Sequence, residues 1–401
     1  VTKKKILYFT SFEHLGVTNT FFNSFFNILI KNFDQVIIIN SENLRIFTKK
    51  IYSYKNKAIL KKFDKKISFF NPINYNDLNK NIDFKNAVVI RDTSRTFSYY
   101  RLFYFFARKK INQVMISNSG HVQGSIYYYW GYNFNFIFFY LKRELPKKIA
   151  VILTSFGIFS KIDIRFTSFK KLHSSFYHNK KKFFSKPSLY KEMILVKGKQ
   201  FDKSKKVKKT NEYITLIDFD PDYYHTTETV GKYDKKQLST HYTNVIRLLK
   251  KHEILYKKKI IICIHPLYNI KKISKIYKDF NVVKFRTKEF IEKSFIVLFF
   301  DSSSIADAIT LKKRIIALRT DLMFDKKHAS DTYTDVISFK KVNLSKNVKI
   351  NKKRFLFELD KKTKLYNKFL NLYSSANLKN EGNKDIIKII KERFFRNWQQ
   401  K

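Results

Sequence analysis

The segment Ile260–Leu318 decides the fold. It reads IIICIHPLYN at its start, VVKFRTKEFIEKS from Val282 and FIVLFFDSSSIADAITLKKRIIAL from Phe295. One apolar run ends in His265, and a second ends in Asp301 followed by three serines. A helical pattern and a third apolar run come next. In an open α/β sheet, ligands collect where strands end and helices begin, so both strand ends are candidates for holding a phosphate.

Short apolar runs alternate with helical patterns along both halves of the chain, which predicts parallel βαβ units. The runs are nearly continuous rather than alternating, as in sheets covered on both faces. At 401 residues the chain is too long for one ordinary core. We therefore predict an α/β fold of two doubly wound, Rossmann-like domains with a helical C-terminal tail. Strands are expected at Lys5–Thr10, Gln35–Asn40, Lys66–Phe70, Ala87–Arg91, Gln113–Ser117, Ile162–Phe166, Met193–Val196, Tyr213–Ile217, Lys259–Ile264, Val282–Phe285, Phe295–Phe300 and Ile315–Leu318.

A basic, polar break at Phe201–Thr210 (FDKSKKVKKT) marks the predicted junction between the domains. We place an N-terminal Rossmann-like domain at residues 1–205 and a nucleotide-binding domain at 206–340. Residues 341–401 form a basic helical segment that ends in the amphipathic stretch Asp385–Trp398.

Composition limits the class of protein. A single cysteine excludes a disulfide framework and a Cys-rich zinc site. The net charge of +50 has two interpretations. It is either a surface selected for nucleic acid or an anionic membrane, or the drift of an A/T-rich genome that raises Lys, Asn, Ile and Phe together. Zinc-finger spacing, an RNP signature and an isolated basic helix are all missing from the sequence, which argues against nucleic acid as a partner.

No secretory signal is evident in the opening VTKKKILYFTSF. The longest uncharged aromatic stretch, Ser125–Leu141, falls short of the roughly 18–20 residues that a spanning helix needs. It is interrupted by Gly131 and two asparagines, which is typical of a buried or interfacial segment. We expect a cytoplasmic protein that contacts the anionic inner face of the cytoplasmic membrane peripherally, through its lysines and this segment.

Two polar strand ends are candidates for binding phosphate. Ser302, Ser303 and Ser304 open a helix directly after a buried strand, where free N–H groups and hydroxyls suit an anion. The alternative is ordinary N-capping, which needs only one such residue. His265 can donate to a phosphate oxygen, and Pro266 prevents its strand from continuing, although an ordinary turn has the same appearance. Both ends are expected on one edge of one sheet.

A third polar cluster follows the first strand of the second half. Asp218, Asp220 and His225 could orient a donor sugar or diphosphate, and the alternative is a turn built around Pro221. The spelling DFD resembles a metal-binding DxD motif, but the proline and the two-domain pattern argue against one. We predict no obligatory metal.

The order of these motifs resembles a known family. DFDPDYYH at 218–225, IHP at 264–266 and FFDSSSIADAI at 299–309 are similar to motifs of GT-B glycosyltransferases of bacterial surface-carbohydrate and capsule synthesis. The resemblance is to the group of polysialyltransferases and capsular Kdo transferases, in which an HP motif and a serine motif hold the donor nucleotide. The matching motifs lie within Tyr213–Leu318. The N-terminal half resembles the family only in its predicted architecture.

The resemblance implies that His265 and the three serines contact the phosphate of a CMP- or UDP-linked sugar, which is substrate, with no further cofactor. It places a surface polysaccharide or lipid-linked glycan acceptor toward the N-terminal domain. An inverting, metal-independent transferase needs a base within hydrogen-bond reach of the acceptor hydroxyl. Candidates are Glu13 and His14, in the loop after the first strand, and Asp92, after the strand AVVIR. A solvated loop is the alternative for the first pair.

Other functions stay open at this point. The same architecture would serve a glycerophosphotransferase of teichoic-acid type or a nucleotide-sugar epimerase. A non-catalytic, basic nucleic-acid-binding protein is the alternative from another class. Stabilisation by a nucleotide would favour the enzymes, and steeply salt-dependent binding of DNA or RNA would favour the last.

Overall fold

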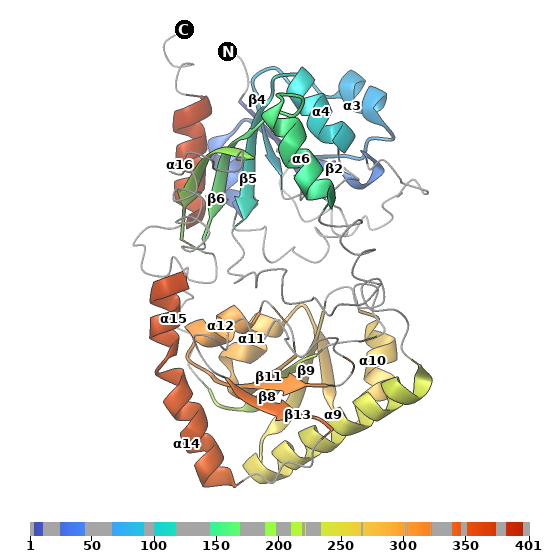
Figure 1. The fold of residues 1–401 in the computed structure, drawn as a ribbon, viewed down its shortest axis with the longest axis vertical. Coiled ribbons are helices and arrows are strands. Elements are labelled where there is room, and N and C mark those ends of the chain that lie inside the picture. The colour runs from blue at the N-terminus through green and yellow to red at the C-terminus, as the bar shows by residue number, and fades with distance from the viewer. Residues whose placement is uncertain are drawn as a thin grey trace. The chain divides into compact units, whose positions relative to one another are not determined.

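Two parallel sheets organise the chain in a computed structural model (Figure 1). One compact unit, unit 1, comprises Val1–Ser119, Phe134–Lys199 and Asn377–Lys401, and the other, unit 2, comprises Gly120–Asn133 and Gln200–Ala376. The structure describes residues 4–10, 25–44, 66–91, 100–117, 145–168, 189–197, 210–218, 221, 234–265, 268–300, 302, 304–320, 322, 339–345, 351–373 and 382–395.

The sheet of unit 1 has seven parallel strands in the order β3-β2-β1-β4-β5-β6-β7. Its order reverses between β1 and β4, which pair directly, so this sheet has its switch point there. All five residues of β4 are buried, as expected for a strand covered on both faces. The strands are β1 Lys5–Thr10, β2 Gln35–Asn40, β3 Ile67–Phe70, β4 Ala87–Arg91, β5 Asn112–Ser117, β6 Ile162–Thr167 and β7 Tyr190–Leu195.

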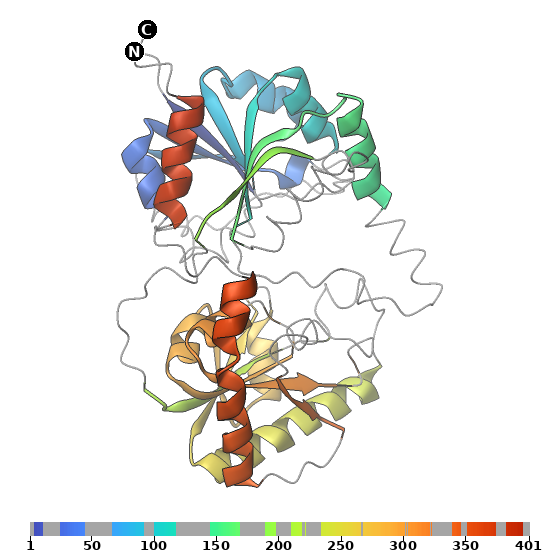
Figure 2. The same cartoon turned by 60° about the vertical axis from the view of Figure 1, so that its left-hand side comes forward.

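Successive side chains of β1 point to opposite faces of the sheet and so enter two separate cores of unit 1. Ile6 and Tyr8 belong to a cluster with the helix at 25–32 and with α16, whereas Leu7 and Phe9 belong to a cluster with α3 and α4, against which α6 packs. Helix α16 accordingly covers the face of the sheet opposite α4 and α6 (Figures 1 and 2). The other described helices of unit 1 are η1 Glu42–Leu44, α3 Tyr75–Asn81, α4 Tyr100–Arg108, α6 Leu145–Ser155 and α16 Gly382–Phe394.

The sheet of unit 2 has six parallel strands in the order β10-β9-β8-β11-β12-β13. Its order reverses between β8 and β11, again at a directly paired position. The strands are β8 Tyr213–Ile217, β9 Lys259–Ile264, β10 Asn281–Lys284, β11 Ser294–Phe299, β12 Arg314–Arg319 and β13 Lys340–Asn343. The helices are α9 Lys235–Tyr256, α10 Ile270–Ile276, α11 Thr287–Glu292, α12 Ile305–Thr310, α14 Lys352–Thr363 and α15 Tyr366–Tyr373.

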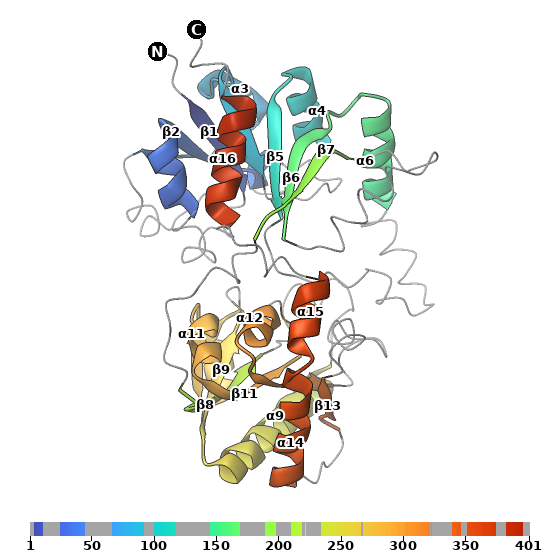
Figure 3. The same ribbon diagram turned by 90° about the vertical axis from the view of Figure 1, so that its left-hand side faces the viewer.

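Helix α9 shows how local sequence sets these elements. Asp234 and Gln237 form a reciprocal capping box at its start, and Lys257 ends it in the left-handed conformation with φ of 52°. Its buried face packs with α10 and α14 on one side of the sheet. Helices α11, α12 and α15 contribute to the core on the other side, and α14 and α15 follow one another along the unit (Figure 3).

The predicted fold class, two doubly wound α/β domains with a helical C-terminus, is confirmed. Residues 341–401, however, are divided between the units rather than forming one separate segment. Helices α14 and α15 pack on unit 2, whereas Ile386, Ile387 and Ile390 of α16 enter a core of unit 1. Close packing fixes the start of α16, because a Cβ on Gly382 would lie 1.9 Å from the carbonyl oxygen of Lys197.

Within the described ranges, no helix has both the length and the apolar character needed to cross a membrane. The aromatic segment Ser125–Leu141 lies outside those ranges.

Candidate functional site

Polar residues gather at the carboxyl edge of the unit 2 sheet. Asp218 follows β8, His265 follows β9, Ser302 and Ser304 follow β11, and Thr320 follows β12. All these strands are parallel, and β8 lies between β9 and β11. With neighbouring strands roughly 4.8 Å apart, the ends of β9 and β11 are about 10 Å from each other. His265, Ser302 and Ser304 therefore lie on one edge, at the switch point where α/β sheets bind ligands.

His265 is exposed immediately after β9. Its carbonyl oxygen accepts a hydrogen bond from the Tyr268 N–H at 2.9 Å, which closes a turn. The imidazole packs against the buried Tyr268 ring at a centroid distance of 5.3 Å. This arrangement fixes the ring at the surface, where it can donate to an anionic oxygen. Pro266 lies outside the described residues.

The two described serines of the DSSS turn differ in what they do. Ser302 Oγ accepts a hydrogen bond from the Ser304 N–H at 3.2 Å, so its hydroxyl stabilises the turn. Ser304 is the N-cap residue of α12, and its side chain makes no capping hydrogen bond. The turn therefore uses the Ser302 hydroxyl, whereas α12 makes no capping hydrogen bond with the Ser304 hydroxyl. Ser303 lies outside the described residues.

Asp218 is tied into the core of unit 2. Its side chain is buried, and Oδ1 accepts a hydrogen bond from the hydroxyl of the fully buried Tyr277 at 3.0 Å. Its N–H donates to the Cys263 carbonyl oxygen at 2.9 Å. These bonds hold the end of β8 against β9 and α10, which favours a positioning role for this carboxylate over contact with a sugar. Asp220 and His225 lie outside the described residues.

His241 adds a buried imidazole to the polar residues at this edge, and it was not among the site residues predicted from the sequence. It lies on α9, is only 3% exposed, and its Nδ1 forms a 3.0 Å hydrogen bond with Oγ1 of Thr320. Its ring centroid is 5.5 Å from that of Phe300, at the end of β11. Burial lowers the pKa of His241 to about 4, so the ring is neutral near pH 7. The signal was its place in the apolar stripe of α9, four residues before Val245, where a solvated histidine is not expected.

The candidate bases all lie outside the described residues. Glu13 and His14 belong to the loop after β1, and Asp92 comes directly after β4. These two strands are neighbours at the switch point of unit 1, where Phe9 lies opposite Arg91. The carboxyl ends of β1 and β4, which these residues follow in the sequence, therefore lie at the edge where a ligand of this unit is expected.

Arg91 is the second functional candidate that sequence reasoning missed, because the pattern AVVIR identifies it only as the end of a strand. It is fully buried at the carboxyl end of β4, and its guanidinium carbon lies 4.6 Å from the Phe103 ring centroid. Nearby strand ends are polar too: Thr10 is buried at the end of β1, and Asn40 donates from Nδ2 to Asn71 Oδ1 at 2.7 Å. A guanidinium at this edge suits an anionic ligand.

Among the described residues, no group of three or more His, Cys, Asp or Glu side chains could hold a metal ion. Apart from the buried Asp218 carboxylate, the polar side chains described at both edges are hydroxyls, imidazoles, amides and a guanidinium, which can donate hydrogen bonds to oxygen atoms.

Comparisons with protein-family models and with curated protein sequences gave no match. Solved structures do match. A Listeria monocytogenes protein provisionally identified as a UDP-N-acetylglucosamine 2-epimerase has a TM-score of 0.54 at 12% identity, over 99% of this chain and 98% of that one. The UDP-GlcNAc 2-epimerase of Neisseria meningitidis, bound to UDP-GlcNAc, has a TM-score of 0.52 at 13% identity, over 97% and 100%. The S. aureus MnaA–UDP co-structure has a TM-score of 0.52 at 12% identity, over 98% and 96%.

At such identities the likeness concerns the fold. The chain has the GT-B fold, with two Rossmann-like units and a helix from the C-terminus returning to the first. None of these three structures is described as a polysialyltransferase or a Kdo transferase, so the narrower resemblance stays a prediction.

Proposed function

We propose that the chain is a nucleotide-sugar enzyme that holds the diphosphate of its donor at the carboxyl edge of the unit 2 sheet. The observation that carries the proposal is the position of His265, Ser302 and Ser304 on one edge of the sheet, after the two strands that flank β8. The exposed imidazole and the Ser304 hydroxyl are donors on a rigid support, as recognition of a phosphate requires. The favoured activity is transfer of the sugar to a surface polysaccharide or lipid-linked glycan.

In this reaction the acceptor oxygen displaces the nucleotide from the anomeric carbon in line, with inversion. Glu13, His14 or Asp92 removes the proton from the acceptor hydroxyl as the new bond forms. Negative charge develops on the departing diphosphate, where His265 and Ser304 donate hydrogen bonds and lower the barrier. No step in this scheme requires a metal or a further cofactor.

A nucleotide-sugar epimerase is the second candidate. It is favoured by the comparison, because structures with TM-scores above 0.5 are described as UDP-GlcNAc 2-epimerases or contain UDP. For the same reason UDP is the first nucleotide to test, ahead of CMP.

Binding of UDP tests the donor site. Saturating UDP should raise the free energy of unfolding by about 2.7 kcal/mol when its concentration is one hundred times Kd. His265→Ala and Ser304→Ala should each weaken binding at least about tenfold in calorimetric titration, because each removes a hydrogen bond to a charged oxygen.

Thr310→Ala is the matched control. The Thr310 hydroxyl lies at the other end of α12 and donates to the Ala306 carbonyl oxygen at 2.8 Å. This variant should bind UDP like the wild type. Unchanged UDP affinity in the His265/Ser304 double variant would refute the proposed phosphate site.

The two activities separate without an acceptor. Incubated with UDP-GlcNAc alone in D2O, an epimerase inverts C2 and exchanges its proton for deuterium, which NMR detects. A transferase leaves C2 unchanged and releases UDP only when an acceptor or water takes the sugar.

A further inference from the structure

An exposed apolar patch lies at the end of α6 in unit 1. Ile152, Phe156 and Ile158 are 51%, 77% and 45% exposed. Ile152 and Phe156 are one helical turn apart, so they share a face. Ile254 on α9 is also 77% exposed, but the residues three and four positions from it are all lysines. Single exposed apolar residues are ordinary, whereas a contiguous group marks an interaction surface.

The patch is held in a fixed turn. The Phe156 N–H donates to the Ile152 carbonyl oxygen at 3.1 Å, and the Ile158 N–H donates to that of Leu153 at 2.9 Å. Gly157 adopts the left-handed conformation with φ of 74°, and Phe159 is buried against the Tyr100 ring. The chain therefore buries Phe159 and presents its neighbours to solvent.

Cations surround the same edge of the sheet. Strands β5 and β6 are paired with Val114 opposite Ile164, so their amino ends are adjacent. Lys109 and Lys110 precede β5 and Lys161 precedes β6, and all three are exposed. Within the described part of the chain none of the three forms an ion pair, whereas the neighbouring Asp163 is 2.6 Å from Lys191.

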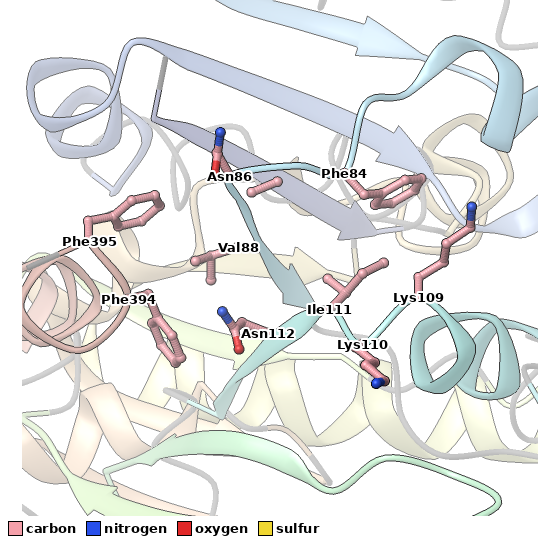
Figure 4. Close-up of a pocket in the computed structure, with 10 residues that line it drawn as sticks. Phe84, Asn86, Val88, Lys109, Lys110, Ile111, Asn112, Phe394 and Phe395 are labelled. Carbon is pink, nitrogen blue, oxygen red and sulfur yellow. The ribbon is translucent and has the colours of Figure 1, made fainter. Parts of the chain in front are cut away.

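A hollow beside these lysines completes the surface (Figure 4). It has a volume of about 220 Å³ and lies between the amino ends of β4 and β5 and the end of α16. Lys109 and Lys110 line it together with Asn86, Asn112 and the ring of Phe394. Its ammonium and amide groups suit the phosphate of a lipid headgroup.

We propose that this edge of unit 1, from the turn after α6 to Lys109 and Lys110, docks on an anionic lipid surface. Ile152, Phe156 and Ile158 enter the boundary between headgroups and acyl chains, and the lysines pair with headgroup phosphates. Apolar insertion together with cations fits a lipid surface better than a nucleic acid, whose backbone requires the cations alone. The proposal goes beyond nucleotide-sugar chemistry and does not depend on it.

Sedimentation of the full chain with vesicles, in the absence of nucleotide, tests the proposal. The wild type should bind vesicles of phosphatidylcholine and phosphatidylglycerol and bind pure phosphatidylcholine vesicles far more weakly. Ile152→Ser combined with Phe156→Ser should weaken binding about tenfold for each side chain. Replacing Lys109, Lys110 and Lys161 by Gln should weaken it about fivefold for each charge removed.

Ile254→Ser is the matched control, since that side chain is equally exposed on another unit, and it should leave vesicle binding unchanged. Absence of binding by the wild type, or equal binding by the Ile152/Phe156 variant, overturns the proposal. The proposal is also overturned if the chain binds duplex DNA in preference to vesicles and only the Lys→Gln replacements abolish that binding. UDP titration of the same variants reports separately on the donor site, so failure of one proposal is distinguishable from failure of the other.

Discussion

Replacing His241 by Gln should remove much of the acid sensitivity of unit 2. His241 is buried, and its pKa is lowered from 6.5 to about 4 by burial. Above pH 6.5 neither the folded nor the unfolded state protonates this ring, so it adds no pH dependence. Between pH 6.5 and 4 only the unfolded state binds the proton. The free energy of unfolding therefore falls by about 1.4 kcal/mol for each unit by which the pH is lowered. The whole window is worth about 3 kcal/mol.

The single cysteine gives a probe confined to unit 2. Cys263 is 1% exposed in β9, and burial raises the pKa of its thiol to about 12, so it should stay unlabelled in the folded protein. Labelling with 4,4′-dithiodipyridine, which reacts in acid, then measures the unfolded fraction across a urea series. His241→Gln is the appropriate variant, because its amide side chain is neutral at every pH and can still form a hydrogen bond with Thr320.

Between pH 6.5 and 4.5 the wild type should lose about 2 to 3 kcal/mol more stability than His241→Gln. His252 is also buried with a lowered pKa, but it is present in both proteins and cancels in the difference. Parallel pH profiles of the two proteins would refute the reasoning, because they would mean that His241 is already protonated, or solvated, in the folded state.

Two further substitutions probe the backbone. Gly382→Ala should destabilise unit 1 by about 1–3 kcal/mol, because the new methyl group meets the Lys197 carbonyl oxygen and α16 must move; hydrogen exchange of β7 and α16 measures this, and unaltered protection there would contradict it. Lys257→Gly should stabilise unit 2 by about 0.5–1 kcal/mol in urea unfolding, because φ of 52° is strained for lysine and unstrained for glycine. Lys257→Ala should show no such gain, and equal effects of Gly and Ala would exclude backbone strain as the cause.

The fold was largely predictable because each strand carries its own signal. KILYFT, QVIIIN and AVVIR are apolar enough to identify as strands buried on both faces, and the structure has strands at those residues. Helix α6 was not predicted, because its start, Leu145-Pro146, has the appearance of a break, although proline is tolerated in a first helical turn. The packing of α16 on unit 1 could not be predicted from the sequence either. An amphipathic pattern identifies the apolar face of a helix but does not identify the core against which that face packs.

The candidate site was predictable only where a residue ends a strand. His265 and the serine turn have that position, and the parallel topology brings them to one edge. His241 contributes from a helix that crosses the sheet, and its hydrogen bond to Thr320 joins residues 79 positions apart. Contacts of this kind depend on how α9 is placed on the sheet, which a strand-end pattern does not encode.

Three of the lysines that contribute to the net charge of +50 have a structural explanation. The chain has only 8 glycines, and helix ends that would ordinarily use glycine use lysine instead. Lys110, Lys257 and Lys312 follow α4, α9 and α12 with φ of 50°, 52° and 53°. A lysine at that position also faces the negative end of the helix dipole. Positive charge at the amino edges therefore arises in both units without any partner, and charge alone identifies none. What distinguishes the end of α6 is its three exposed apolar side chains, and a partner that accepts both features is a lipid surface.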